Sequence, residues 1–234
     1  MIADHETNVV YVADTLERRF PSVYGGLRSI LEQHRLPLRT IPGTKDVWCR
    51  DYMPIQVAED RFVQFTYAPD YLGGRYGHLR ADGEIGPGLS VTRNCARSEI
   101  VLDGGNVVAW TDKVIVCDKM FGENPRWKSS GLLRKLRDLF GVGEVIVIPS
   151  EPGDVIGHSD GVVRFIDGTS VILNDYQSVD VFYRRILRRQ LLKAGLGLVE
   201  IPYSPPPYQP RKTPSAVGNY LNFRVYSTVT GPIL

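Results

Sequence analysis

The chain has 234 residues, 43% of them hydrophobic, which is enough to bury a large core in one or two domains. Its 28 basic and 26 acidic residues are interspersed and leave a net charge of +2, so the composition gives no reason to expect a nucleic-acid partner. No apolar run approaches the roughly 18 residues that cross a bilayer, and acidic side chains among the first twenty residues argue against a signal peptide. We therefore expect a soluble cytoplasmic protein without membrane contact.

The cysteines indicate the same compartment. Cys49, Cys95 and Cys117 are odd in number, far apart and without a CxxC pair. This pattern favours neither a disulfide framework nor a zinc site, and it suits a reducing environment. We expect no metal and no cofactor.

Short strands and helices alternate along the chain. The expected strands are rich in β-branched residues, and the expected helices carry apolar residues at helical spacing. In chain order we expect a strand over 8–14, a helix over 22–35, strands over 38–42, 61–67, 99–103 and 113–118, a helix over 125–139, strands over 144–149 and 169–175, a helix over 179–194, a strand over 198–202 and a last strand around 217–225. This order predicts an α/β fold.

Local signals place the ends of the helices. Ser22 and Asn124 are the expected N-caps of the first two helices, and the third is expected to start after Ser178. Gly141 and Gly195 follow the expected ends of the second and third helices, where glycine is the preferred residue.

A long loop is expected over residues 68–93, which are rich in glycine, tyrosine and proline. Loops of this length inside compact domains are often lids or binding loops. Two readings of its tyrosines, Tyr67, Tyr71 and Tyr76, stay open: they line a substrate entrance, or they pin the loop down.

A repeat of about fifty residues runs through the chain. Three expected strands end in Ile-Pro, and the separation of 107 residues between Pro42 and Pro149 is about twice the separation of 53 between Pro149 and Pro202. Nine residues beyond Pro42 lies Asp51, and nine beyond Pro149 lies His158. Repeats of this length are typical of solenoids and propellers.

The same spacing predicts a copy centred near residues 95–96. Its polar site falls near residue 104, where the chain has Asp103 and Asn106. A further unit would carry its site beyond residue 255, whereas the sequence stops at Leu234. We therefore expect about four units and a missing last one.

The polar residues of the repeat suit a planar cation. Asp51, Asp103, His158 and Asp160 fall on loops or strand starts, which the repeat is expected to bring to one end of a common axis. A guanidinium presents a fork of N–H donors that matches carboxylates. Histidine suits proton transfer because its ordinary pKa lies near neutrality, and Asp103 could hold the imidazolium form of His158. Attack on a guanidinium carbon needs a strong nucleophile, usually a thiolate.

Five strings in the sequence carry a family resemblance. WCRDYMP, LDGGN, DKMFGENP, GHSDGVVRF and GNYLNF occur in this order over nearly the whole chain. They resemble the agmatine deiminases and bacterial peptidylarginine deiminases, whose motifs include W-x-R-D-x-x-P, [DE]-G-G-N and G-H-x-D-x-x-x-R-F. The resemblance implies a hydrolase that releases ammonia from a guanidino substrate.

The resemblance also implies the fold. The family has the pentein fold, a five-bladed α/β propeller of ββαβ-type units. Here we expect an incomplete propeller of about four of the five units, with residues 1–234 forming a single catalytic domain that lacks its C-terminal blade.

Roles for the substrate-binding residues follow from the resemblance. Asp51 and Asp160 are expected to grip the guanidinium. Trp48, Arg50 and Asn106 belong to the same motifs and are expected to contribute to substrate binding. The partner is therefore a small cationic guanidino compound.

The catalytic residues implied by the resemblance are His158 and Asp103, which serve proton transfer. The family's nucleophile is a cysteine in a G-G-G-x-H-C motif of the last blade, and no such string occurs in this sequence. The Trp-rich opening typical of dedicated agmatine deiminases is also absent, so agmatine, arginine and peptidylarginine stay open as substrates.

Three functional classes follow. The first is a deiminase-type hydrolase that works through a covalent thiouronium intermediate when the cysteine is supplied. The second is a nucleophile-free guanidine-binding protein, and the third is an inactive truncated remnant. An incomplete propeller exposes strand edges, so a homodimer is a further expectation.

Structural readings stand beside the functional ones. Asp103 with its glycines could be an ordinary turn, and His158 could be structural. Cys49, expected on a strand where it shares a face with Asp51, favours a packing role. The basic run near the last helix is expected to be a solvated face; it comprises Arg184, Arg185, Arg188 and Arg189.

Overall fold

The computed structural model describes residues 1–81, 94–206, 217–223, 226–228 and 231–233. The chain forms two compact units. The N-terminal unit comprises Ile2–Gly104 and Arg224–Leu234, and the C-terminal unit comprises Met1 and Gly105–Phe223. Parts of the expected loop over 68–93, of the proline-rich stretch over 202–214 and of the chain's last residues lie outside the described residues.

Three small sheets share one arrangement, in which the central strand is antiparallel to the strand before it and parallel to the strand after it. The first sheet contains β3 (Ile55–Ala58), β4 (Arg61–Thr66) and β5 (Cys95–Val101). The second contains β6 (Val108–Trp110), β7 (Lys113–Cys117) and β8 (Glu144–Ile148), and the third contains β9 (Val163–Phe165), β10 (Ser170–Asp175) and β11 (Gly197–Pro202). The recurrence confirms a mixed α/β fold built from small sheets, while the count of propeller units stays a prediction.

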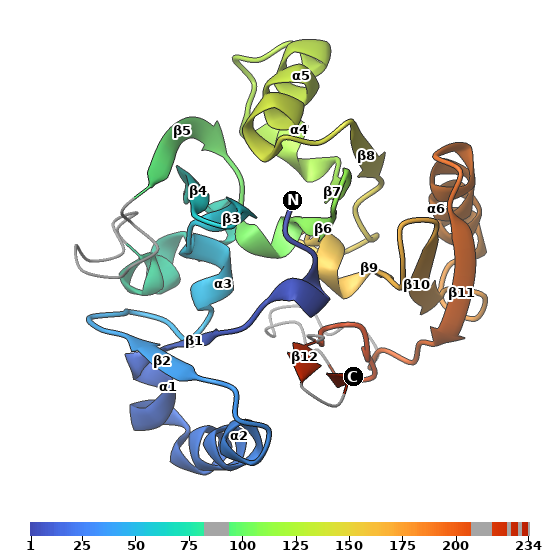
Figure 1. Ribbon diagram of the computed structural model, residues 1–234. Helices are drawn as coiled ribbons and strands as arrows, with labels where there is room; N and C mark the ends of the chain where they lie inside the picture. Colours follow the sequence, from blue (N-terminus) through green and yellow to red (C-terminus); the bar gives the residue numbers. More distant parts are fainter. Residues whose placement is uncertain (82–93, 207–216, 224–225, 229–230, 234) are drawn as a thin grey trace. The chain divides into compact units, whose positions relative to one another are not determined.

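The parallel pair in each sheet needs a crossover connection, and helices provide it in the C-terminal unit. Helix α5 (Ser129–Phe140) joins β7 to β8, and α6 (Val181–Lys193) joins β10 to β11. Figure 1 shows α6 running alongside β10 and β11. Between β4 and β5 the described residues hold only two 3₁₀ helices, η2 (Asp70–Leu72) and η3 (Gly74–Leu79), as the glycine-rich composition led us to expect.

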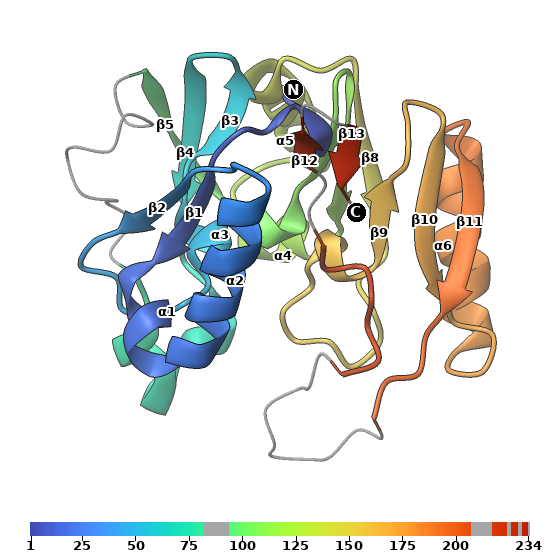
Figure 2. The same ribbon diagram turned by 60° about the horizontal axis from the view of Figure 1, so that its bottom comes forward.

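The N-terminal unit begins with a parallel pair, β1 (Val10–Ala13) and β2 (Leu38–Ile41). They are joined by α1 (Asp14–Arg19) and α2 (Pro21–Gln33), and Figure 2 shows α2 beside this pair. The short hairpin β12 (Tyr226–Thr228) and β13 (Gly231–Ile233) contacts the 3₁₀ helix η1 (Asp4–Glu6).

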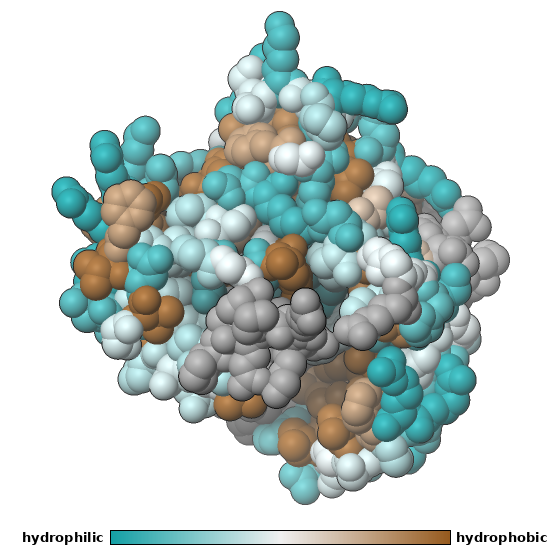
Figure 3. Space-filling model, turned by 180° about the vertical axis from the view of Figure 1, so that it is seen from behind, coloured by the Kyte–Doolittle hydropathy of each residue, from teal (hydrophilic) through white to brown (hydrophobic). Residues whose placement is uncertain are grey.

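One hydrophobic core runs through the C-terminal unit. Strands β7, β8, β9 and β10 and helix α6 contribute its fully buried members, among them Ile115, Cys117, Ile148, Val163, Val171, Leu173, Leu187 and Leu191. Helix α5 buries Leu132, Leu136 and Phe140. The side chains that it exposes are polar or charged, which is the pattern of an amphipathic helix at a surface. Teal atoms form the uppermost tip of Figure 3, and brown atoms lie below them.

The helix starts differ from the expected ones, and of these three helices only the last has a side-chain cap. The first helix has Phe20 rather than Ser22 at its N-cap, with Pro21 inside the first turn. Asn124 ends the short helix α4 (Lys119–Glu123), where its amide donates to the Met120 carbonyl at 2.8 Å, and α5 starts only at Ser129. Helix α6 is capped by Asp180, whose carboxylate accepts from the Tyr183 N–H at 2.8 Å.

Two of the three expected helices end next to the glycines that the sequence predicted, whereas the first ends at Gln33, two residues earlier than expected. Gly141 and Gly195 have φ of 66° and 72°, the left-handed conformation that glycine adopts without strain. The last expected strand is wrong for residues 217–223, which form a turn and an irregular segment without strand pairing. Here Gly218 has φ 85°, and a Cβ on it would lie 2.1 Å from the Ser204 carbonyl oxygen.

The basic run of α6 is only half solvated. Arg184 donates to Asp175 at 2.9 Å and to Glu200 at 2.8 Å, and Arg188 donates to Glu200 at 2.5 Å. Arg185 and Arg189 are exposed. The expectation of a wholly solvated face is therefore wrong, because acidic residues on β10 and β11 lie under one side of the helix.

Across the described ranges no helix is both long enough and apolar enough to cross a bilayer.

Candidate functional site

The predicted site residues occupy equivalent connections between strands. Asp51 lies between β2 and β3, Asp103 between β5 and β6, and His158 and Asp160 between β8 and β9. Each connection leaves the last strand of one sheet and enters the first strand of the next. Asp51 and Asp103 belong to the N-terminal unit, and His158 and Asp160 to the C-terminal unit. That all four bind one ligand stays a prediction.

Asp51 lies on a helical turn, α3 (Cys49–Tyr52), and not at a strand start. Tyr52 is buried and donates its hydroxyl to the Asp46 carbonyl at 2.8 Å, which fixes the turn. Residues two apart on a helix do not share a face. The expectation that Cys49 and Asp51 point the same way is therefore wrong, and the Cys49 thiol donates to the Tyr11 carbonyl at 3.6 Å.

The connection before α3 is held by Asp14. Its carboxylate accepts from the N–H groups of Gly43 at 2.8 Å and Thr44 at 3.0 Å, and from the Thr44 hydroxyl. Burial opposes ionisation of Asp14, but these hydrogen bonds outweigh it and lower its pKa. The bonds fix the chain seven and eight residues before Asp51.

Asp103 is 3% exposed and accepts a hydrogen bond from the Tyr71 hydroxyl, with 2.8 Å between Oη and Oδ2. Tyr67 is buried and packs edge-on against Tyr52, with 5.7 Å between the ring centroids. Burial raises the pKa of Tyr67, and the charges of Asp51 and Asp103 raise it further. Asp51 and Asp103 therefore both lie near the phenol of Tyr67.

The Asp-Gly-Gly-Asn string is more than a surface turn. A Cβ on Gly104 would lie 2.0 Å from the Arg50 carbonyl oxygen, so the backbone of this string packs directly on α3. The close approach requires glycine and ties the connection of Asp103 to that of Asp51. The two motifs of the N-terminal unit are therefore adjacent in space.

The other three residues predicted to bind substrate differ in exposure. Trp48 is 61% exposed and Arg50 is half-buried. Asn106 is 3% exposed, and its amide accepts from the Cys117 N–H at 2.6 Å and donates to the Cys117 carbonyl at 3.4 Å. In this conformation Asn106 holds the end of β7, and its contact with a substrate stays a prediction.

His158 is half-buried at the start of the 3₁₀ helix η6 (Ser159–Gly161). Asp154 accepts from the N–H groups of Ile156 at 2.8 Å and Gly157 at 2.9 Å, and so shapes the turn before it. Gly157 has φ 68°, and a Cβ there would lie 2.6 Å from the Lys119 side chain. The turn that presents His158 is therefore set by backbone hydrogen bonds and by a required glycine.

Asp160 is 6% exposed and pairs with Arg164 at 3.8 Å. Arg164 is itself buried and donates its Nε to the Leu221 carbonyl at 3.0 Å. The Asn219 amide donates to the Gly161 carbonyl at 2.7 Å. The GNYLNF string thus holds the turn of Asp160, a role that the sequence reasoning missed although it had singled out the string.

A second feature escaped the sequence reasoning altogether. Glu151 accepts hydrogen bonds from the hydroxyls of Tyr176 at 2.9 Å and Tyr203 at 2.8 Å. Burial raises its pKa, although the two phenols act in the opposite direction. No local signal could have found this cluster, because its members are 25 and 52 residues apart.

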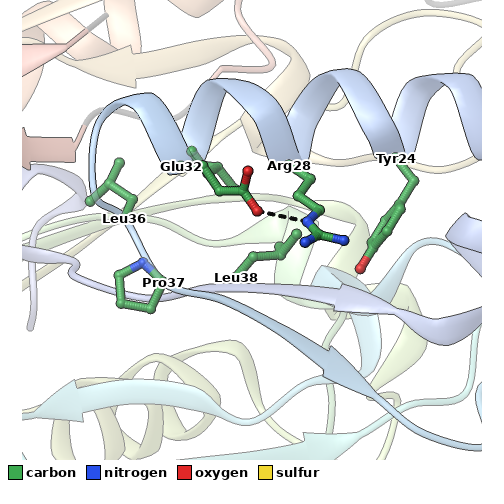
Figure 4. A pocket seen from close by; sticks show the side chains of 7 residues that line it. Tyr24, Arg28, Glu32, Leu36, Pro37 and Leu38 are labelled. Atoms are coloured by element: carbon green, nitrogen blue, oxygen red, sulfur yellow. Dashed lines mark hydrogen bonds and ion pairs between the residues drawn. The ribbon is translucent and has the colours of Figure 1, made fainter.

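A shallow pocket in the N-terminal unit lies apart from these residues. Figure 4 shows it between α2 and the start of β2, with Arg28 and Glu32 paired at 2.7 Å across its lining. Its lining residues are Tyr24, Arg28, Leu31, Glu32, Leu36, Pro37 and Leu38. None of them belongs to the predicted motifs, so the geometry of the motifs, and not this pocket, defines the candidate site.

Comparison with known proteins agrees with the motifs. Agmatine deiminase of C. jejuni superposes with a TM-score of 0.71 at 17% identity, covering 96% of this chain and 79% of that one. Agmatine deiminase of Enterococcus faecalis superposes with a TM-score of 0.66 at 17% identity, covering 96% and 77%. This likeness shows the fold. No curated protein matches the chain. A family model described as Porphyromonas-type peptidyl-arginine deiminase matches residues 1–232, and the chain belongs to this family.

Proposed function

We propose that this protein binds a guanidino compound, agmatine or an arginine side chain, with the deiminase motifs of its family. Asp51 and Asp160 bind the guanidinium, and Asp103 and His158 serve proton transfer. Family membership over residues 1–232 supports these roles. In the complete reaction of such enzymes, a cysteine thiolate attacks the guanidinium carbon, ammonia leaves, and water then hydrolyses the thiouronium intermediate.

One observation supports the proposal most directly. The charges of Asp51 and Asp103 both raise the pKa of the buried Tyr67. The close approach of Gly104 to the Arg50 carbonyl brings the connections of the two carboxylates into contact. Carboxylates gathered in a partly buried place attract a cation that can satisfy several of them. A planar guanidinium offers five N–H donors for this purpose.

The thiolate is the part of the mechanism that the three cysteines do not supply. Cys117 is fully buried, and burial raises the pKa of its thiol well above the ordinary value. Burial also raises the pKa of Cys95. The Cys49 thiol is turned to the Tyr11 carbonyl. We therefore propose that the 234-residue polypeptide binds the cation and releases no ammonia.

Calorimetry with the purified polypeptide tests the proposal. Agmatine, arginine and an N-acylated arginine amide are titrated in turn, and the tightest ligand identifies the substrate class. Asp51→Asn and Asp160→Asn are expected to abolish binding, because each removes a charged partner of the fork. Asp138→Asn, at an exposed position of α5, is the matched control and leaves binding unchanged.

An ammonia assay on the same samples completes the test. Cys49→Ser is expected to change neither binding nor ammonia release. Ammonia release by the wild-type polypeptide that disappears in Cys49→Ser would make Cys49 the nucleophile. If none of the three ligands binds, the third class, an inactive remnant, replaces the proposal.

A further inference from the structure

Tyr71 lies directly on one of the two predicted catalytic residues. It is part of η2, in the glycine-rich segment between β4 and β5, and its hydroxyl donates to Asp103 Oδ2 at 2.8 Å. Asp103 is 3% exposed. This contact ties one oxygen of the carboxylate to the phenol.

A second phenol extends the contact. The side chains of Tyr67 and Tyr71 are hydrogen-bonded to each other. Tyr67 in turn packs on Tyr52 of α3, the helix that carries Asp51. The two predicted carboxylates of the N-terminal unit are thus linked through phenols.

We propose that Tyr71 is a positioning residue, whose hydroxyl, supported by Tyr67, fixes the Asp103 carboxylate for its work on a bound guanidinium. This inference rests on the proposed function and adds to it a residue outside the family motifs. It also gives the segment that carries η2 and η3 a role, since that segment places the hydroxyl on Asp103.

The chemistry of the phenol suits this role. Burial raises the pKa of Tyr71, and the charge of Asp103 raises it further. The hydroxyl therefore keeps its proton at any physiological pH and stays a donor to Asp103. A group that holds a carboxylate without taking its charge leaves that charge available to a cation.

The test compares two variants that each lose one phenol hydroxyl from the N-terminal unit. Tyr71→Phe removes the donor to Asp103, and Tyr24→Phe, on α2, is the matched control. Methylguanidinium is titrated by calorimetry at concentrations far below those that denature proteins. Tyr71→Phe is expected to bind it about tenfold more weakly, the effect of losing a hydrogen bond to a charged group, whereas Tyr24→Phe binds like the wild type.

A spectroscopic measurement separates positioning from a general loss of structure. In protein labelled with ¹³Cζ-tyrosine, Asp103→Asn should shift the Tyr71 resonance, because the charged acceptor is lost, and leave the Tyr24 resonance in place. Thermal unfolding checks that the variants are folded.

The outcomes are distinct. Two results overturn this inference alone. In the first, the wild type binds methylguanidinium, and Tyr71→Phe binds it as tightly as Tyr24→Phe does. In the second, the Tyr71 resonance does not shift in Asp103→Asn. Failure of the wild type to bind methylguanidinium, agmatine and arginine overturns the proposed function and the inference with it.

Discussion

The turn of Asp160 is held by side chains that bond to backbone carbonyls far away in the sequence. Asn219 donates to the Gly161 carbonyl and Arg164 donates to the Leu221 carbonyl, so two residues hold the turn of Asp160 from both sides. Asn174 donates to the same Gly161 carbonyl at 2.8 Å. Buried polar groups with this many partners are costly to disturb. The turn that carries Asp160 is therefore held by hydrogen bonds from within the protein.

Glu151 gives a prediction at this scale, because its pKa is raised by burial between two phenols. The folded protein keeps the proton of Glu151 to a higher pH than the unfolded chain does. Its contribution to the unfolding free energy is therefore fully present below about pH 4.3, the ordinary pKa of glutamate, and is lost as the pH rises through the folded pKa.

Glu151→Gln removes this titration. Urea unfolding at pH values from about 4 upward should show the wild type losing stability relative to Glu151→Gln as the pH rises. Asp138→Asn, at an exposed carboxylate of α5, serves as the control and should give a difference that does not change with pH. A constant difference between wild type and Glu151→Gln would mean that Glu151 has the same pKa in both states.

Among the elements, α3 and the connection that contains Gly104 form the tightest contact between two motifs. A Cβ on Gly104 would lie 2.0 Å from the Arg50 carbonyl oxygen, a distance that real contacts do not reach. Gly104→Ala therefore forces the backbone of one motif away from the other. Overpacking of this kind costs about 1–3 kcal/mol, and it moves Asp103 and Asp51 apart.

The matched control is Gly26→Ala on α2, where a Cβ would meet nothing within 4 Å. Replacing glycine by alanine inside a helix stabilises by roughly 0.5–1 kcal/mol. Chemical unfolding should thus show a lower free energy of unfolding for Gly104→Ala and a higher one for Gly26→Ala. Calorimetry should show lost guanidinium binding for Gly104→Ala only. Equal stability of the two variants would contradict the close contact of the motifs.

At the scale of the whole molecule, the outer edge of β11 bears on self-association. Among the described strands, β11 pairs only with β10, and its Val199 is 47% exposed. An exposed strand edge with apolar side chains is a template for pairing with another chain. We therefore expect the protein to dimerise as its concentration rises.

Val199→Lys places a charge beside this edge and should shift the protein toward the monomer in sedimentation experiments. Leu192→Lys, at a 54% exposed position of α6 and not on β11, is the control and should leave the association unchanged. If the wild-type protein stays monomeric at all concentrations, the edge of β11 is not an association surface.

The sequence alone determined the features that depend on neighbours along the chain. The Ile-Pro strand ends gave the repeat, whose strand arrangement recurs in three sheets. Gly141 and Gly195 marked helix ends because only a residue without a Cβ adopts the left-handed conformation freely. The motif strings indicated the family, which the match over residues 1–232 confirms.

Only the tertiary structure decided where side chains find partners. Asp51 lies on a helical turn because the Tyr52 hydroxyl is tied to the Asp46 carbonyl, a bond that no strand or helix propensity encodes. Tyr71 reaches Asp103 across 32 residues, and Asn219 reaches Gly161 across 58. Such pairs form only when the folded chain brings distant residues together, and the local sequence around each residue does not encode its partner. The sequence therefore located the motifs, whereas only the packing of the folded chain shows which residues hold them in place.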